Sequence, residues 1–263
     1  MSASGEKSER LAERRRVPIV SLLVDVCNYE SASKRVARLV AADDGGYVCC
    51  ATVHMTMEAV DDQGFREIVN SASMVTPDGM PLVWMQRLRG AKDAVQVRGP
   101  SLMPKLLAFA AENELTVGFH GGSESVLFEV QKRAAEEFPS LKIGYSHSPP
   151  FREIADNEDA EMIEELNASA THIVFVGLGC PKQERWMAAH RDDTKAVMIG
   201  VGAAFDFYAG RSTESPDWLR KLGLEWLFRL FSEPRRLWRR YLILNPRFMR
   251  LAALQQLGRR KVD

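Results

Sequence analysis

The apolar residues of this chain fall into short runs that alternate with stretches of helical spacing. Short apolar runs bounded by turn residues predict buried strands, and apolar residues every three to four positions predict helices. The predicted strands cover residues 17–26, 47–53, 73–75, 115–119, 142–145, 172–176 and 196–201. The predicted helices cover residues 31–41, 58–71, 80–88, 101–112, 124–137, 156–168 and 181–191. This alternation implies parallel βαβ units, so the predicted fold class is α/β with a doubly wound, mainly parallel sheet.

The pattern changes toward the C-terminus, where only helical spacing remains from Trp218 onward. We expect breaks at Pro234 and Pro246, because proline disrupts the interior of a helix. The chain therefore divides into a main α/β domain over residues 17–210, which is the candidate catalytic domain, and a basic, aromatic helical appendage over residues 211–263. Residues 1–16 are polar and charged, which predicts a disordered tail and not a secretory signal.

The formal net charge of zero hides an asymmetry between these two parts. Residues 211–263 carry 13 Lys and Arg against 5 Asp and Glu, whereas the remaining residues carry 22 against 30. A basic appendage on an acidic body predicts an anionic partner, although a solvated helical face is the alternative. Arginines interleaved with aromatic residues favour an anionic membrane leaflet. Nucleic acid is disfavoured as a partner, because the body is acidic and no nucleic-acid motif occurs.

Two further patterns bound the setting of the protein. No apolar run reaches the roughly 18–20 residues that are needed to cross a bilayer, so contact with a membrane would be peripheral. The four cysteines, Cys27, Cys49, Cys50 and Cys180, form no CxxC pair. A zinc site or a disulfide framework is therefore not expected, and a reducing cytoplasm fits best.

Polar and glycine-rich segments follow several predicted strands, where parallel sheets build ligand sites. Asp78 follows one strand and has Gly79 beside it, which fits either a general base or an ordinary Asp-Gly turn. Gln183 lies just inside a helix start and offers donor and acceptor atoms for a sugar hydroxyl or a uracil edge. Glu184 fits either the same pocket or a favourable contact with the helix dipole. Asp206 could hold a ribose or sugar hydroxyl, or cap the next segment.

Taken together, these segments resemble the WecG/TagA/CpsF family of bacterial glycosyltransferases. The resemblance covers about residues 48–248, and its specificity comes from the order and combination of several motifs. The motifs are residues 54–59 (HMTMEA), 77–79 (PDG), 99–103 (GPSLM), 177–184 (GLGCPKQE), 200–206 (GVGAAFD), 223–229 (GLEWLFR) and 233–236 (EPRR).

The resemblance implies a Rossmann-like core with a C-terminal helical appendage that faces the membrane. It implies inverting, metal-independent transfer of a hexose or N-acetylhexosamine, such as ManNAc, from a UDP-sugar and without a cofactor. The implied acceptor is a saccharide linked to undecaprenyl pyrophosphate, in exopolysaccharide or cell-surface glycan synthesis. The implied location is the cytoplasm, at the inner face of the cell membrane, and a homo-oligomer is left open. The sequence of residues 54–59 and 180–184 is more similar to the exopolysaccharide branch than to the teichoic-acid branch.

The resemblance also assigns roles to individual residues. Asp78 would be the base that deprotonates the acceptor hydroxyl, and arginines of the appendage would offset charge on the departing UDP. The implied substrate-binding residues are Thr52, His54, Gly79, Gln183, Glu184, Gly200, Gly202, Asp206, Arg211, Arg229 and Arg236.

Three positions depart from the family pattern. A Thr-x-Asn element loses its Asn, which Thr52 or His54 replaces depending on register. Gln96 stands where the family commonly has arginine, with Arg98 nearby. Glu214 also replaces an arginine, for which Arg211 is a stand-in. These departures keep open an alternative, a non-catalytic nucleotide-sugar-binding or membrane scaffold protein that retains the fold. A nucleotide-binding oxidoreductase is disfavoured, because the dinucleotide fingerprint is missing.

Overall fold

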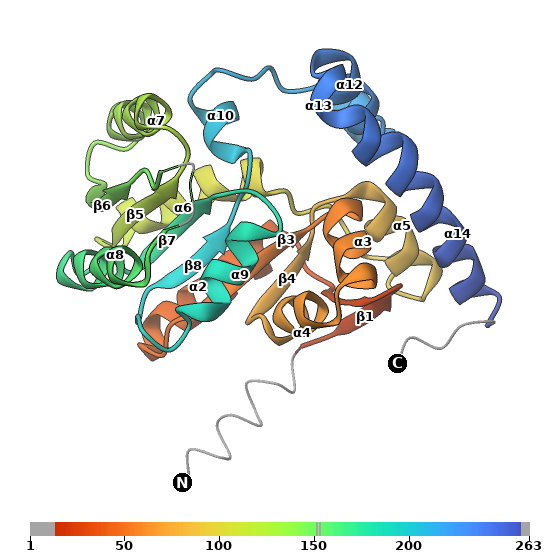
Figure 1. Ribbon diagram of the computed structural model, residues 1–263, viewed down its shortest axis with the longest axis horizontal. Helices are drawn as coiled ribbons and strands as arrows, with labels where there is room; N and C mark the ends of the chain where they lie inside the picture. Colours follow the sequence, from red (N-terminus) through yellow and green to blue (C-terminus); the bar gives the residue numbers. More distant parts are fainter. Residues whose placement is uncertain (1–13, 151, 153, 259–263) are drawn as a thin grey trace, which may run out of the picture.

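The protein is built on a six-stranded parallel sheet, seen in a computed structural model that describes residues 14–150, 152 and 154–258 (Figure 1). The strand order is β4-β3-β8-β7-β5-β6, and every neighbouring pair is parallel. The strands are β3 (Gly46–Ala51), β4 (Met74–Pro77), β5 (Thr116–Gly121), β6 (Lys142–His147), β7 (Ile173–Gly177) and β8 (Val197–Gly200). The predicted α/β class and parallel sheet are confirmed.

Helices cover both faces of this sheet, as the continuous apolar strands require. In β7, Ile173 and Phe175 belong to one hydrophobic core, and Val174 and Val176 belong to the other. The helices of the first face are α2 (Tyr29–Ala42), α6 (Gly99–Glu112) and α7 (Glu124–Glu137). The other core includes residues from α3 (Val53–Asp61), α4 (Gln63–Ser71), α5 (Met80–Leu88), α8 (Asp156–Ala168) and α9 (Lys182–Ala189). Because successive strand residues point to opposite faces, the sheet separates two buried cores.

The predicted single strand over residues 17–26 is wrong. The chain forms an antiparallel hairpin instead, with β1 (Arg16–Ile19) and β2 (Leu22–Asp25). Val20 takes a φ of 56°, which is uncommon for a β-branched residue. Because this position is Val and not Gly or Asn, the sequence gives no signal for the turn. Tertiary hydrogen bonds hold this turn: Gln255 Oε1 accepts from the Val20 amide at 3.0 Å, and Ser21 Oγ donates to the Thr56 carbonyl at 2.9 Å.

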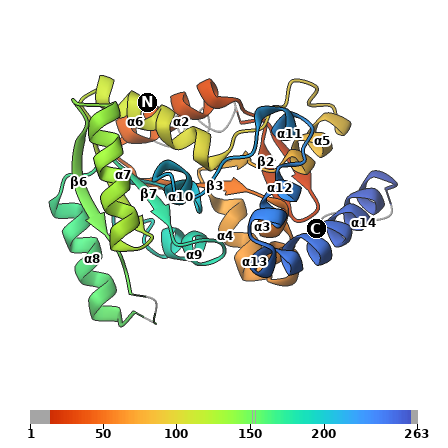
Figure 2. The same cartoon turned by 90° about the horizontal axis from the view of Figure 1, so that it is seen from above.

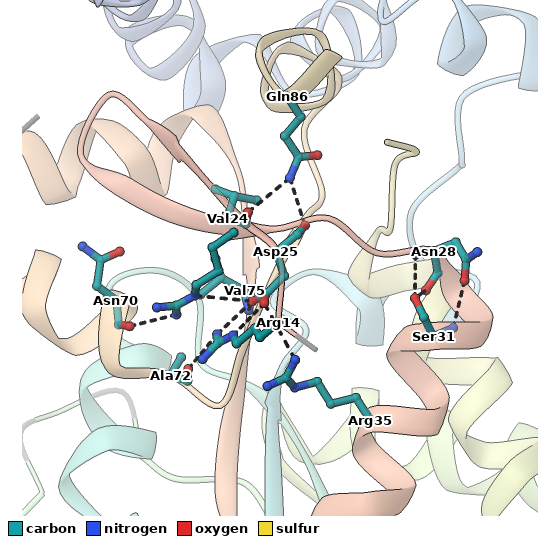
Figure 3. Close-up of polar contacts among 11 residues, drawn as sticks. Arg14, Val24, Asp25, Asn28, Ser31, Arg35, Asn70, Ala72, Val75 and Gln86 are labelled. Atoms are coloured by element: carbon teal, nitrogen blue, oxygen red, sulfur yellow. Dashed lines mark hydrogen bonds and ion pairs between the residues drawn. The ribbon is translucent and has the colours of Figure 1, made fainter. Parts of the chain in front are cut away.

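The hairpin is joined to the sheet through Asp25, which is 3% exposed (Figure 3). Its carboxylate accepts from Arg14 Nε at 2.6 Å, from Arg14 Nη2 at 2.8 Å and from the Val75 amide of β4 at 2.7 Å. Guanidinium nitrogens of Arg16 and Arg35 lie 3.9 Å from the same carboxylate. Arg14 and Arg16 thus belong to the fold, and the predicted disordered tail is wrong for residues 14–16. Residues 1–13 lie outside the described residues.

Two other predicted boundaries are also wrong. The predicted helix over residues 58–71 is two helices, α3 and α4, and it starts too late. Asp62 separates them: its amide donates to the Glu58 carbonyl, and its carboxylate accepts from the Phe65 amide at 2.9 Å. Thr52 caps the start of α3, which shortens the preceding strand to Ala51.

The C-terminal segment is helical and lies along one side of the molecule (Figures 1 and 2). It follows α10 (Ala204–Tyr208), which packs into the core of the sheet, and its own elements are α11 (Asp217–Lys221), α12 (Glu225–Ser232), α13 (Pro234–Arg239), the π-helical turn η1 (Arg240–Leu244) and α14 (Asn245–Gln256). The break at Pro234 is confirmed. The break at Pro246 is wrong, because helical backbone continues from α13 through η1 into α14 and places Pro246 in the first turn of α14. A π-turn is a common way to fit proline into a continuing helix. Within the described residues, no helix has both the length and the apolar character needed to cross a membrane.

Candidate active site

A cleft of about 1080 Å³ opens where the parallel strands end. Its floor comes from residues that follow β3, β4, β7 and β8, and its opposite wall comes from the C-terminal helices. Among the predicted site residues, those that line it are Thr52, His54, Asp78, Gln183, Gly200, Gly202, Asp206, Arg211 and Arg229. The fold therefore collects, from positions up to 177 residues apart in the numbering, most of the residues singled out from the sequence.

Asp78 lies on the cleft floor directly after β4 and is half-buried. Its Oδ2 accepts a hydrogen bond from the Gly99 amide at 2.9 Å, which orients the carboxylate. Burial raises the pKa of Asp78 to about 6, although Arg98 and the Gly99 hydrogen bond oppose the rise. A carboxylate with a pKa close to neutral is suited to accept a proton in a reaction near pH 7.

Arg98 connects the floor of the cleft to the C-terminal helices. It is 3% exposed, and its Nη2 donates to Glu225 Oε1 of α12 at 2.8 Å. Its Nη1 lies 3.4 Å from Glu214 Oε2, so two carboxylates share one guanidinium. Glu214 therefore forms an ion pair with Arg98, and its carboxylate offers no favourable contact to a phosphate. Arg98 is next to Gly99, and this places an ion-paired but still charged guanidinium near Asp78.

Gln183 holds two glycine-rich loops together beneath the cleft. Its Oε1 accepts from the Gly179 amide at 3.2 Å and from the Gly202 amide at 3.1 Å. Its Nε2 donates to Glu184 Oε1 at 2.6 Å. Glu184 is fully buried and is not among the residues that line the cleft. Burial raises the pKa of Glu184 to about 7. The structure thus places Glu184 behind Gln183, as a support and not as a pocket wall.

We expect Gln183→Leu to raise the KM for the substrate that contacts these loops about tenfold and to lower the free energy of unfolding by about 1–3 kcal/mol. Leucine cannot accept from the Gly179 and Gly202 amides, which leaves both loops without their shared acceptor. Steady-state kinetics and urea unfolding measure the two effects. Gln131→Leu is the matched control, since Gln131 bonds to Leu127 and Ser146 away from these loops. An unchanged substrate KM in Gln183→Leu would contradict this role.

Thr52 and His54 lie at the start of α3, on the side of the cleft below the C-terminal helices. Thr52 Oγ1 accepts from the Met55 amide at 3.3 Å as the helix cap. His54 Nε2 lies 3.2 Å from Glu58 Oε1 and 3.5 Å from Arg240 Nη2. Burial, and then the charge of Arg240, lower the pKa of His54 to about 4. His54 is therefore neutral at pH 7 and can accept or donate a hydrogen bond.

Gly200 and Gly202 lie where a side chain would collide with its neighbours or would strain the backbone. A Cβ on Gly200 would lie 2.8 Å from Met187 and 3.0 Å from the Gln183 amide nitrogen, and Gly202 has a φ of +56°. Gly79 does not line the cleft, but its backbone starts α5 beside it. Asp206 lies in the first turn of α10, and its carbonyl accepts from the Arg211 amide at 2.9 Å.

The appendage contributes cations to the cleft. Arg229 lies over the Phe207 ring at 5.5 Å, and its buried Nε has no hydrogen-bond partner among the described residues. Arg240 also lines the cleft and was not among the residues assigned to substrate binding. Arg236 belongs to α13, but its side chain lies outside the described residues. Glu225 and Arg98 were likewise missed as site residues, because no local pattern pairs two residues that are 127 positions apart.

Across the described part of the chain, no three His, Cys, Asp or Glu side chains are grouped in a way that could hold a metal ion. The absence of a metal from the reaction stays a prediction.

A parallel α/β sheet with arginines over a cleft at its strand ends is the arrangement of enzymes that bind phosphorylated ligands. The chain belongs to the glycosyl transferase WecG/TagA/CpsF family, whose model matches residues 17–262. It is 31% identical, over 75% of each chain, to an N-acetylglucosaminyldiphosphoundecaprenol N-acetyl-beta-D-mannosaminyltransferase from Bacillus spizizenii strain W23. It is 29% identical to the Bacillus subtilis strain 168 protein of the same name, again over 75% of each chain. A Staphylococcus aureus strain MW2 protein of that name is 27% identical, over 73% of this chain and 74% of its own length.

Proposed function

We propose that this protein is an inverting glycosyltransferase that moves a sugar from a UDP-sugar to a saccharide linked to undecaprenyl pyrophosphate. The observation that carries the proposal is the Asp78 carboxylate, oriented by Gly99 on the floor of a cleft whose other wall carries Arg229 and Arg240. The names of the relatives support a lipid-diphosphate acceptor and favour N-acetylmannosamine as the transferred sugar. We place the reaction in exopolysaccharide or cell-surface glycan synthesis, as the sequence suggested.

The proposed chemistry is a single displacement. Asp78 accepts the proton of the acceptor hydroxyl, and the hydroxyl oxygen forms a bond to the anomeric carbon of the donor. The bond from that carbon to the diphosphate oxygen breaks, and its electron pair leaves with UDP. Arg211, Arg229 and Arg240 offset the charge that develops on the diphosphate, which is a role that oriented cations perform in a partly enclosed site.

The test is a transfer assay that pairs a panel of UDP-sugars with an acceptor built as N-acetylglucosaminyl diphosphate on a polyprenol. We expect UDP release only when acceptor is present, and an acceptor that gains one sugar by mass spectrometry. Binding of UDP-sugars without any acceptor-dependent UDP release would favour the scaffold alternative.

A base with a pKa of about 6 predicts the pH dependence of this reaction. The carboxylate must be ionised to accept the proton, so kcat/KM should fall about tenfold per unit as the pH drops below 6. Arg98→Gln removes the charge that most lowers the pKa of Asp78, so the midpoint should move to higher pH. Profiles of kcat/KM between pH 4.5 and 9 measure both effects.

Glu214→Gln is the control for that substitution. It breaks one ion pair of Arg98 but leaves the Arg98 charge and its bond to Glu225 in place. Its acidic midpoint should match that of the wild type. A midpoint that stays the same in Arg98→Gln would show that Asp78 is not the titrating group.

We also propose that the appendage attaches to the cytoplasmic face of a membrane. Its helices expose large apolar side chains, and exposed arginines accompany them, which suits an interface with anionic lipid. The most exposed apolar residues of the appendage are Trp218, Leu222, Phe231, Trp238, Leu242, Ile243, Met249 and Leu257. Cosedimentation with vesicles that contain phosphatidylglycerol should exceed that with neutral vesicles. A protein that binds neither kind of vesicle would refute the attachment.

A further inference from the structure

The appendage holds a second, separate pocket, between α11 and α12. Its volume is about 370 Å³, and its walls are Leu219, Leu227, Phe228, Phe231 and Ser232. Ser232 supplies the only hydroxyl in these walls, and its Oγ donates to the Phe228 carbonyl of its own helix at 3.0 Å. Among the side chains that the structure describes, no charged one lines the pocket. This described surface therefore offers contacts mainly to an apolar group.

This pocket and the active-site cleft lie on two faces of the same short helix. In α12, Glu225 and Arg229 face the cleft, and Leu227, Phe228 and Phe231 face the pocket. A helix with its side chains is about 10–12 Å across, so the apolar pocket lies within about one helix diameter of Arg229. Glu225 is fixed by its bond to Arg98, and this holds the helix in that orientation.

The turn between α11 and α12 is fixed against the main domain. Gly223 has a φ of +71°, and a Cβ there would lie 2.6 Å from the Trp84 ring of α5. This close packing leaves both pocket-forming helices attached to the body of the protein. Phe231 nonetheless is 77% exposed, so one large aromatic wall of the pocket faces outward. An aromatic side chain this exposed beside an apolar hollow indicates a surface that another apolar group covers.

The proposed function supplies an amphiphilic molecule that matches this layout. A polyprenyl diphosphate acceptor places an uncharged, branched hydrocarbon chain directly after two phosphates. Arg229, on the cleft side of α12, can contact a phosphate, and the apolar side of the same helix fits the hydrocarbon that follows.

We propose that the pocket formed by Leu219, Leu227, Phe228, Phe231 and Ser232 binds the phosphate-proximal isoprene units of the lipid-linked acceptor. This inference rests on the proposed function. It adds a binding site for the hydrocarbon itself, distinct from the general attachment of the appendage to a bilayer. The site would make acceptor use depend on the first few isoprene units, even where no membrane is present.

The test varies the lipid and the pocket together, in solution without vesicles and below the micelle concentration. The acceptors share one sugar diphosphate and carry a methyl group, two isoprene units or a straight ten-carbon chain. We expect the KM of the wild type to be at least about tenfold lower for the two-isoprene acceptor than for the methyl acceptor, because apolar area is buried. The straight chain should give a smaller gain, since the branched chain matches the pocket.

Two variants change the pocket in opposite ways. Phe231→Ala removes a wall, and Ser232→Trp fills the space, and both residues are exposed, so folding should be unaffected. Each should reduce the preference for the isoprene acceptor to less than about threefold and leave kinetics with the methyl acceptor unchanged. Ile243→Ala is the control, because Ile243 is 53% exposed on η1 and does not line the pocket. It should retain the full preference.

Three outcomes would overturn the proposal. The first is a wild type that shows no preference for the isoprene acceptor over the methyl acceptor. The second is that the pocket variants keep this preference, and the third is that Ile243→Ala loses as much of it as they do. A change of oligomeric state in Phe231→Ala, seen by sedimentation, would assign the pocket to a second copy instead. Failure of the proposed function is distinguishable, because no acceptor, including the methyl one, would then be used.

Discussion

Asp78→Asn is expected to lower kcat by about 10²- to 10⁴-fold and to leave donor binding close to that of the wild type. The amide keeps the size of the carboxylate, and its oxygen can still accept from the Gly99 amide, so the floor of the cleft is preserved. What is lost is the ability to accept a proton from the attacking hydroxyl. Transfer kinetics measure the loss, and thermal unfolding with and without UDP-sugar measures donor binding.

For the same substitution we also predict an effect on stability. Burial raises the pKa of Asp78, which means that the folded protein disfavours the ionised carboxylate. A neutral amide at this position should therefore leave the melting temperature unchanged or raise it, as is common for residues kept for function. A large loss of activity together with a large loss of stability would instead indicate a structural role. Undiminished turnover would remove Asp78 as the base.

Asp25→Asn is expected to lower the free energy of unfolding by about 3–5 kcal/mol, the range for removing one partner of a buried ion pair. Asp25 is 3% exposed and is the carboxylate to which Arg14, Arg16 and Arg35 lie close (Figure 3). Without its charge, these three cations repel one another in a partly buried space. Burial and the charge of Arg14 already lower the pKa of Arg16 to about 10, which indicates how far that cation depends on Asp25.

Asp93→Asn is the matched control for this measurement. Asp93 pairs with Arg15 at 3.6 Å, but its side chain is 76% exposed, so its loss should change the stability by less than about 1 kcal/mol. Urea unfolding of both variants at pH 7 gives the comparison. A change below about 1 kcal/mol in Asp25→Asn would show that the hairpin is held by its apolar contacts and not by this cluster.

The sheet was predictable because most of its strands, although not the edge strand β6, are buried on both faces and so form continuous apolar runs. The features that the sequence did not predict arise where tertiary contacts override local sequence preferences. Val20 turns the chain at a positive φ because Gln255 and Thr56 bond to the turn from distant helices. Pro246 fails to break its helix because a π-turn precedes it. Neither the partner residues nor the π-turn leaves a pattern in the neighbouring sequence.

The sequence indicated where the residues of the candidate site lie, but not which hydrogen bonds and ion pairs their side chains form. Residues after strand ends meet at one edge of a parallel sheet, and Asp78, Gln183 and Gly202 do line one cleft. Their roles there stay predictions. That Glu184 supports Gln183 from behind depends on side-chain direction, which spacing alone does not determine. The pairing of Arg98 with Glu225 depends on how the appendage folds back over the sheet.

The anomeric configuration of the transferred sugar tests the proposed function most directly. The donor would be an α-linked UDP-sugar, and a single displacement with Asp78 as base inverts that centre. Nuclear magnetic resonance of the product formed on the N-acetylglucosaminyl diphosphate acceptor should therefore show a β-linked sugar, formed only when the acceptor is present and at most weakly by Asp78→Asn. An α-linked product, or UDP release without any sugar on the acceptor, would contradict it.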